Sequence, residues 1–125
     1  MKQVVGFLVA GALFGCGAFV PTVDLTALSA SEKHEVRKIG IYDQNLLQGK
    51  SYKILNIVEG NSCKNKTWDP PATRTAAIDQ LKYFAYESGA NGISDVQCSN
   101  RERTSLNTNC WDLISCTANA LKVDE

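Results

Sequence analysis

The chain has 125 residues, among them 13 basic and 13 acidic side chains. The first 15 residues carry Lys2 and no acidic residue, so the remainder has a net charge of about −1. This balance gives no electrostatic case for nucleic acid or a charged membrane surface as a partner. Residues 16–125 suffice for one domain with a modest hydrophobic core.

Residues 1–15 have the features of an export signal peptide. Lys2 supplies the positive charge, and Val4 to Phe14 form the apolar segment. The sequence Leu-Phe-Gly-Cys that ends at Cys16 is typical of a lipobox, in which a small residue precedes the cysteine that receives diacylglycerol. After cleavage this cysteine becomes an N-acylated N-terminus. We therefore predict a lipoprotein with Cys16 as its lipidation site.

Two other readings of the N-terminus are an uncleaved anchor, since apolar residues continue to Val20, and plain secretion. Three acyl chains, such as palmitate and the two of diacylglycerol, exceed what stable anchoring requires. Gly17 follows the cysteine in place of the Asp that is associated with inner-membrane retention. This favours the outer membrane, with the rest of the chain facing the periplasm or the cell surface.

Residues 16–38 are predicted to be a tether between the lipid and the folded domain. The segment from Ser29 to Lys38 is charged and lacks periodic apolar positions, so we expect it to be flexible or marginally helical. Pro21 is its single proline, so a semi-rigid extended spacer is not encoded.

A domain is predicted over residues 39–125, beginning with a short strand at 39–42 and a turn that Gly49 closes. Residues 52–59 alternate well enough for a second strand, with Tyr52 and Ile54, and also Ile57 and Val58, expected to turn inward. Residues 60–71 have the composition of a loop, which Cys63 would fasten.

A helix is expected from about residue 72 to 88, with Thr73 as its cap and Gly89 as its left-handed stop. Strands follow at 93–98 and 110–123, separated by a polar hairpin loop. The order of strand, helix and strand suggests that the strands of Ile54 and Ile93 pair in parallel. The apolar helix face is formed by Ala77, Ile78, Leu81, Phe84 and Ala85. The fold class is α+β, with about four strands and one main helix.

Four cysteines downstream of an export signal predict two disulfides and an oxidising compartment. In a strand, Cys110 and Cys116 would lie about 20 Å apart, whereas a disulfide needs Cα atoms within about 7 Å. That pairing is excluded. Two arrangements stay open: Cys63–Cys110 with Cys98–Cys116, or Cys63–Cys116 with Cys98–Cys110.

Neither catalysis nor a metal site is indicated. His34 is the single histidine and falls in the tether, so a nucleophile in the domain would lack a histidine base. The cysteines form no CxxC pair or Cys/His cluster of the kind that holds zinc. The carboxylates are dispersed over loops and helix faces. We expect no enzyme, no metal and no cofactor.

Trp68 is the better functional candidate, because it lies in a polar loop and aromatic side chains are enriched in binding hot spots. Packing over the Cys63 disulfide is the alternative for Trp68, and a core or disulfide-covering position for Trp111. Arg101 and Arg103 in the hairpin loop are candidates for contact with lipopolysaccharide phosphates or an acidic partner, although such pairs are more often solvated.

Several motifs occur in a characteristic order: Gly60-Asn-Ser-Cys63, Pro70-Pro71, Ala90-Asn91, Cys98, Cys110 and Cys116. Together they resemble the RcsF family, the outer-membrane sensor lipoproteins of the Rcs envelope-stress phosphorelay. The resemblance covers about residues 39 to 123 and the lipoprotein signal. The resemblance implies the pairs Cys63–Cys110 and Cys98–Cys116.

The resemblance also implies signal transduction without catalysis. Such a protein reports envelope or lipopolysaccharide damage by contacting an inner-membrane regulator of the IgaA type, which feeds a histidine-kinase phosphorelay. Barrel-assembly and outer-membrane barrel proteins are its expected partners. Typical members carry a long Pro/Lys-rich tether, whereas this tether is shorter and has only Pro21. That departure favours an alternative, a structural or adhesive surface lipoprotein with the same fold.

Overall fold

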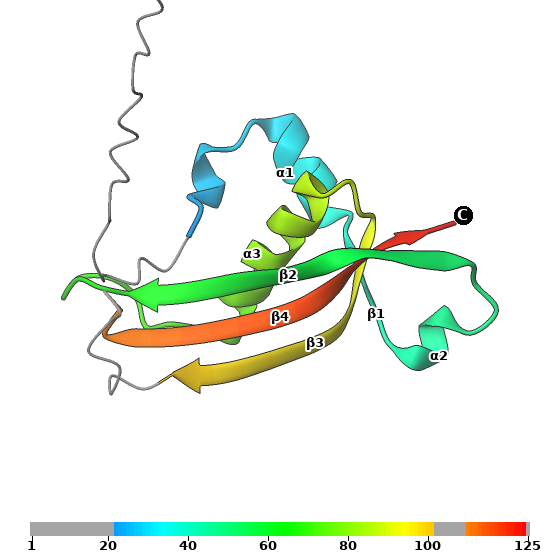
Figure 1. The fold of residues 1–125 in the computed structure, drawn as a ribbon. Helices are drawn as coiled ribbons and strands as arrows, with labels where there is room; N and C mark the ends of the chain where they lie inside the picture. Colours follow the sequence, from blue (N-terminus) through cyan, green and yellow to red (C-terminus); the bar gives the residue numbers. More distant parts are fainter. Residues whose placement is uncertain (1–21, 102–109, 125) are drawn as a thin grey trace, which may run out of the picture.

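The computed structural model describes residues 22–101 and 110–124. The elements follow one another along the chain (Figure 1) as η1 (Leu25–Ala27), α1 (Ala30–Arg37), β1 (Gly40–Tyr42), α2 (Gln44–Leu47), β2 (Tyr52–Lys64), α3 (Arg74–Glu87), β3 (Gly92–Arg101) and β4 (Asp112–Val123). This is the predicted α+β fold, with a four-stranded sheet and α3 as the main helix.

The sheet has the strand order β1-β3-β4-β2. β4 is central and pairs antiparallel with both β2 and β3, while β1 pairs in parallel with β3. The predicted parallel pairing of the Ile54 and Ile93 strands is therefore wrong. β2 and β3 do run in the same direction, but β4 lies between them and pairs antiparallel with each.

β2 is longer than the sequence predicted, since it continues through residues 60–64 instead of entering a loop. The composition of this stretch is typical of a turn, but its pairing with β4 supplies strand hydrogen bonds as far as the register pair Lys64 and Asp112. Tertiary pairing overrides weak strand propensity here.

The helix α3 packs against one face of the sheet, and α1 lies on the outer side of α3 (Figure 1). Thr73 caps α3 by accepting a hydrogen bond from the Ala76 amide, and Gly89 adopts φ +82° just after the helix, both as expected from the sequence. Of the predicted apolar face, Ala77, Leu81 and Ala85 are fully buried, whereas Ile78 and Phe84 are partly exposed.

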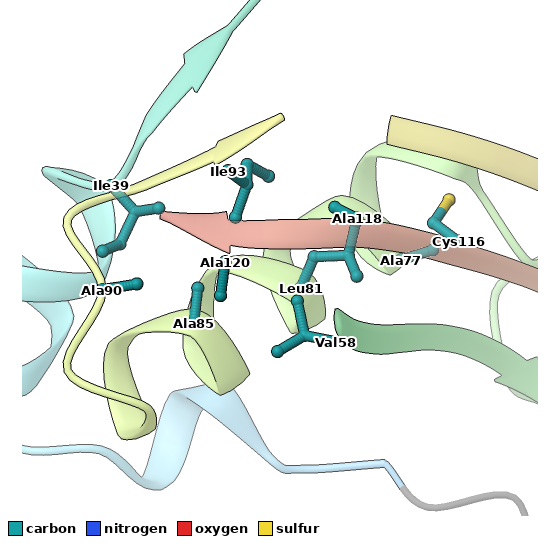
Figure 2. Close-up of a cluster of buried hydrophobic side chains, with 10 residues drawn as sticks. All are labelled: Ile39, Val58, Ala77, Leu81, Ala85, Ala90, Ile93, Cys116, Ala118 and Ala120. Atoms are coloured by element: carbon teal, nitrogen blue, oxygen red, sulfur yellow. The ribbon is translucent and has the colours of Figure 1, made fainter. Parts of the chain in front are cut away.

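The hydrophobic core lies between α3 and the sheet, and small residues dominate it. Figure 2 shows Ala77, Leu81 and Ala85 of α3 beside Ala118 and Ala120 of β4. The remaining members of the cluster are Ile39, Val58, Ala90, Ile93 and Cys116. Alanines on both sides allow a close approach of the helix to the strands.

Gly60 is the closest point of this approach. A Cβ atom built on Gly60 would overlap the carbonyl oxygen of Ala77 and lie 2.5 Å from the Leu81 amide nitrogen. Both obstacles are backbone atoms of α3, so no side-chain rotation would relieve them. The backbone conformation of Gly60 does not require a glycine, because its φ is not in the left-handed region. The close packing of α3 does.

A smaller cluster lies on the opposite face, where α2 covers one end of the sheet. Leu47 of α2 packs against Leu121 and Val123 of β4, with Tyr42 beside them. Ser115, further along the same face of β4, is also buried and donates a 2.6 Å hydrogen bond to Asn61 of β2. The sheet thus has partial cover on its second face.

Candidate functional site

Two disulfides fasten the sheet, Cys63–Cys110 and Cys98–Cys116. Cys98 and Cys116 are direct register partners on β3 and β4, with Cα atoms 4.0 Å apart. Cys63 on β2 is bonded to Cys110, which lies two positions before the start of β4, and their Cα atoms are 5.4 Å apart. These are the pairs that the family resemblance implies, and they cross-link all three long strands.

One end of the molecule carries the strongest candidate for a contact surface. We call it the tip and define it as residues 64–69 together with Trp111. Asp69 organises its turn, because its carboxylate accepts hydrogen bonds from the amides of Asn65 and Lys66 at 3.2 and 3.1 Å. Lys64 donates from Nζ to the Asp69 carbonyl at 2.8 Å. The turn therefore has a defined shape without a hydrophobic core of its own.

The two tryptophans are both exposed on the tip. Trp68 is 80% exposed and Trp111 is 45% exposed. An exposed fraction of 80% leaves little of the Trp68 side chain packed over the Cys63 disulfide, and Trp111 does not belong to the buried core. Lys66 Nζ lies 5.8 Å from the centroid of the Trp68 ring, within the range of a cation–π contact.

Backbone bonds connect the tip to the disulfide and to α3. The Trp111 amide donates to the Lys64 carbonyl at 2.6 Å, directly beside Cys63–Cys110. The Asp112 carboxylate accepts from the Ala72 amide at 3.0 Å, where the chain approaches α3. The exposed indoles therefore stand on a cross-linked base. Such pre-organised aromatic side chains lose little conformational entropy when they bind a partner.

The predicted tether differs from expectation, because residues 29–38 form a capped helix packed on the domain. Ser29 and Glu32 make a reciprocal capping box at the start of α1, and Val36 is buried. The sequence lacks periodic apolar positions here because Val36 is the one residue of α1 that is buried. His34, on the same helix, is exposed.

Gln80 holds the start of this segment against α3. Its Oε1 accepts from the Val23 amide at 2.9 Å, and its Nε2 donates to the Val23 carbonyl at 2.7 Å. The side chain thus pairs with the main chain as a neighbouring strand would. We call this pair of bonds the latch. Sequence reasoning missed it, although a glutamine among the apolar positions of a helix is a detectable signal.

The residues just after the latch form a short capped turn. The hydroxyl and amide of Thr26 both donate to the Asp24 carboxylate, at 2.6 and 3.0 Å, and they lower the pKa of Asp24. Between η1, α1 and α3 lies a crevice of about 370 Å³ with mixed apolar and charged walls, lined by Leu25, Thr26, Leu28, Lys33, Val36, Arg37, Asp79 and Lys82.

The other candidate site residues are only partly placed. Arg101 ends β3 as the register partner of Leu113. Its side chain, Arg103 and the lipidation candidate Cys16 lie outside the described residues. In the ranges 22–101 and 110–124, no group of three or more His, Cys, Asp or Glu side chains is arranged to hold a metal ion. In the same ranges, no helix is long and apolar enough to span a bilayer.

The geometry defines a small α+β domain that is cross-linked by two disulfides and carries exposed aromatic side chains at one end. The model of the RcsF lipoprotein family matches residues 21–124. The chain therefore belongs to the RcsF lipoprotein family. A comparison with curated protein sequences gives no match.

Proposed function

We propose that this RcsF-family lipoprotein is held at the outer membrane by acyl chains on Cys16 and relays envelope or lipopolysaccharide stress by protein contact. The recipient is an inner-membrane regulator of the IgaA type that controls the Rcs phosphorelay. Barrel-assembly and outer-membrane barrel proteins are its other partners. The observation that carries the proposal is the family match over residues 21–124, together with the lipobox at Cys16.

The tip is the surface that we assign to partner contact. The Trp68 indole is 80% exposed, and burial of so large an aromatic ring against a partner would contribute strongly to binding. The disulfide-linked base keeps Trp68 in place. Loss of either disulfide should therefore affect signalling as well as abundance. The role is that of a signalling component and not of an enzyme.

The latch sets how far the tip can reach. With Val23 held on α3, only six residues lie between it and Cys16, so the seven Cα–Cα steps span at most about 25 Å. If α1 and the latch were released, the 22 residues between Cys16 and Ile39 would span about 80 Å when extended. The tether's reach thus depends on whether the latch is closed.

In-cell photocrosslinking tests the proposal. A photoreactive amino acid replaces Trp68 in the full-length lipoprotein, and captured proteins are identified with and without lipopolysaccharide damage. The control position is Ile41, which is exposed on β1 at the other edge of the sheet. We expect damage-dependent capture of an inner-membrane regulator from position 68 and not from position 41. A phosphorelay reporter should rise in parallel.

A second candidate function is that of a structural or adhesive surface lipoprotein. It is favoured by the short tether with its single proline, of which residues 23–37 are further taken up by the latch, η1 and α1. Capture of outer-membrane neighbours alone, unchanged by damage, together with a silent reporter, would support this candidate and contradict the signalling role.

A further inference from the structure

The first half of β2 is an apolar sheet edge. β2 is the terminal strand, and β4 is its only strand partner within the described part of the chain. Four large side chains between residues 52 and 57 are exposed: Tyr52 by 41%, Ile54 by 56%, Leu55 by 38% and Ile57 by 72%. We call residues 52–57 the open edge.

The open edge lies beyond the cover of α3. Val58 and its register partner Ala118 belong to the core under α3, so Ile57 points to the other face of the sheet. Ile54 is the register partner of Leu121, which also faces away from α3. The register shifts between Ile54 and Asn56, where Leu55 is left without a partner on β4. The side chains of Ile54, Leu55 and Ile57 thus remain exposed to solvent instead of packing in a core of the domain.

Two lysines face each other at the open edge, Lys53 within it and Lys122 on the neighbouring strand β4. Lys53 and Lys122 are direct register partners on β2 and β4, and both are exposed. Like charges directly opposite each other destabilise a strand pair. Among the described residues neither lysine forms an ion pair, and exposed Lys50 adds a third positive charge nearby. Asp124 follows Lys122 by two positions in the sequence, and its amide donates to the Ser51 carbonyl.

We propose that the open edge binds an extended segment of a partner protein in which apolar and acidic residues alternate. The segment adds a fifth strand beside β2 through main-chain hydrogen bonds, its apolar side chains cover Ile54 and Ile57, and an acidic side chain lies against Lys53 and Lys122. Strand addition of this kind is a common way for a sheet edge to recognise a peptide. The inference rests on the proposed function and adds to it a second contact surface and the chemistry of the partner.

A second copy of the chain fits this edge less well. Two-fold antiparallel pairing that sets Ile54 against Ile57 of the second copy places Val58 opposite Lys53. The lysine pair would then remain without a carboxylate. The unpaired residue at Leu55 would also occur in both strands near the two-fold axis, where bulges weaken edge-to-edge pairing. Charge complementarity therefore favours an acidic segment of another protein.

The test uses the full chain in detergent micelles and two synthetic eight-residue peptides, one alternating Val and Glu and the other alternating Val and Lys. Fluorescence anisotropy measures binding, and amide hydrogen exchange locates it. We expect saturable binding of the Glu peptide, at least tenfold weaker binding of the Lys peptide, and slowed exchange within residues 52–59. Binding of the Glu peptide should weaken as the salt concentration rises.

Charge reversal sharpens the test. The double variant Lys53→Glu/Lys122→Glu should bind the Glu peptide with an affinity at least tenfold lower than the wild type, and it should bind the Lys peptide more tightly than the Glu peptide. The matched control is Ile41→Glu, which places a charge on β1 at the other edge and should leave both affinities unchanged. Equal binding of the two peptides, protection outside β2, or self-association of the full chain through residues 52–57 would each overturn the proposal.

The stress reporter separates this inference from the proposed function. If the double variant loses peptide binding but still signals under damage, the signalling role stands and the open edge is not the partner surface. If the wild-type chain binds the Glu peptide but gives no damage-dependent output, the edge is a binding site and the proposed function fails.

Discussion

The two halves of β2 belong to one continuous strand, yet their surroundings are opposite. Residues 58–64 lie under α3, where Gly60 touches the helix backbone and Cys63 is cross-linked. Residues 52–57 carry more apolar side chains, and all of them are exposed. The polar-looking half is thus the buried half, which shows that hydrophobicity along a strand does not identify the part that builds the core. The covering helix decides it.

Removing a disulfide from the buried half of the sheet should have the largest effect. We expect the double variant Cys98→Ala/Cys116→Ala to lose about 2–5 kcal/mol of unfolding free energy, as is typical for native bridges in small domains. Chemical denaturation followed by tryptophan fluorescence measures it, and the steady-state level in cells should fall as well. Cys98→Ala alone should lower abundance or abolish signalling. Unchanged stability, abundance and output would contradict a structural role for this bridge.

Gly60→Ala should come next. The added methyl group has only backbone atoms of Ala77 and Leu81 to displace, so α3 must shift from the sheet, and we expect a cost of about 1–3 kcal/mol. Gly49→Ala makes a useful comparison, since nothing lies within 4 Å of its Cβ position and any cost there comes from its φ of +75°. A melting temperature unaffected by Gly60→Ala would show that α3 does not pack as closely as described.

Gln80→Ala removes the latch above the buried half of β2. Two hydrogen bonds of about 1 kcal/mol each are lost, so we expect a cost of about 1–2 kcal/mol and faster amide exchange over residues 23–37. Gln80→Glu keeps the acceptor for the Val23 amide but sets a carboxylate oxygen against the Val23 carbonyl oxygen, so it should cost at least as much as Gln80→Ala. Exchange rates equal to those of the wild type would mean that other contacts hold α1.

Ile57→Thr, in the exposed half, should have the smallest effect on stability. The side chain is 72% exposed and threonine keeps the strand propensity, so we expect a change within about 0.5 kcal/mol. Val58→Thr is the matched control one residue further on, where a hydroxyl would enter the core and should cost distinctly more. Similar unfolding free energies for the two variants would remove the contrast between the halves of β2.

The sequence predicted the parts of the fold that depend on local signals. The cap at Thr73, the stop at Gly89 and the helix between them follow from residue types at fixed positions. The number of strands followed from the spacing of apolar runs. The inward orientation predicted for Tyr52, Ile54 and Ile57 was wrong, because alternation identifies a strand but not which portion a helix will cover.

For the candidate site, the sequence singled out Trp68 because an indole in a polar loop has no evident structural use, and its exposure keeps it a candidate. It did not find the latch or the open edge. The latch joins Gln80 to a residue 57 positions away, and the open edge depends on β2 being the terminal strand. A short window of sequence can show that Gln80 stands among apolar helix positions, but it cannot show that its partner is Val23 or that β2 is a terminal strand.

The sequence by itself predicted the fold class and two disulfides, and the structure confirms both, because each depends on residue types and short spacings. The export signal and the lipobox at Cys16 stay predictions, since they lie outside the described residues. The sequence left two disulfide arrangements open and misplaced the limits of the buried strand. Tertiary structure alone decided that β4 lies between β2 and β3, that Gly60 lies beneath α3, and that residues 52–57 remain uncovered. The physical reason is that burial and pairing are properties of elements brought together in space, and no single segment encodes its neighbours.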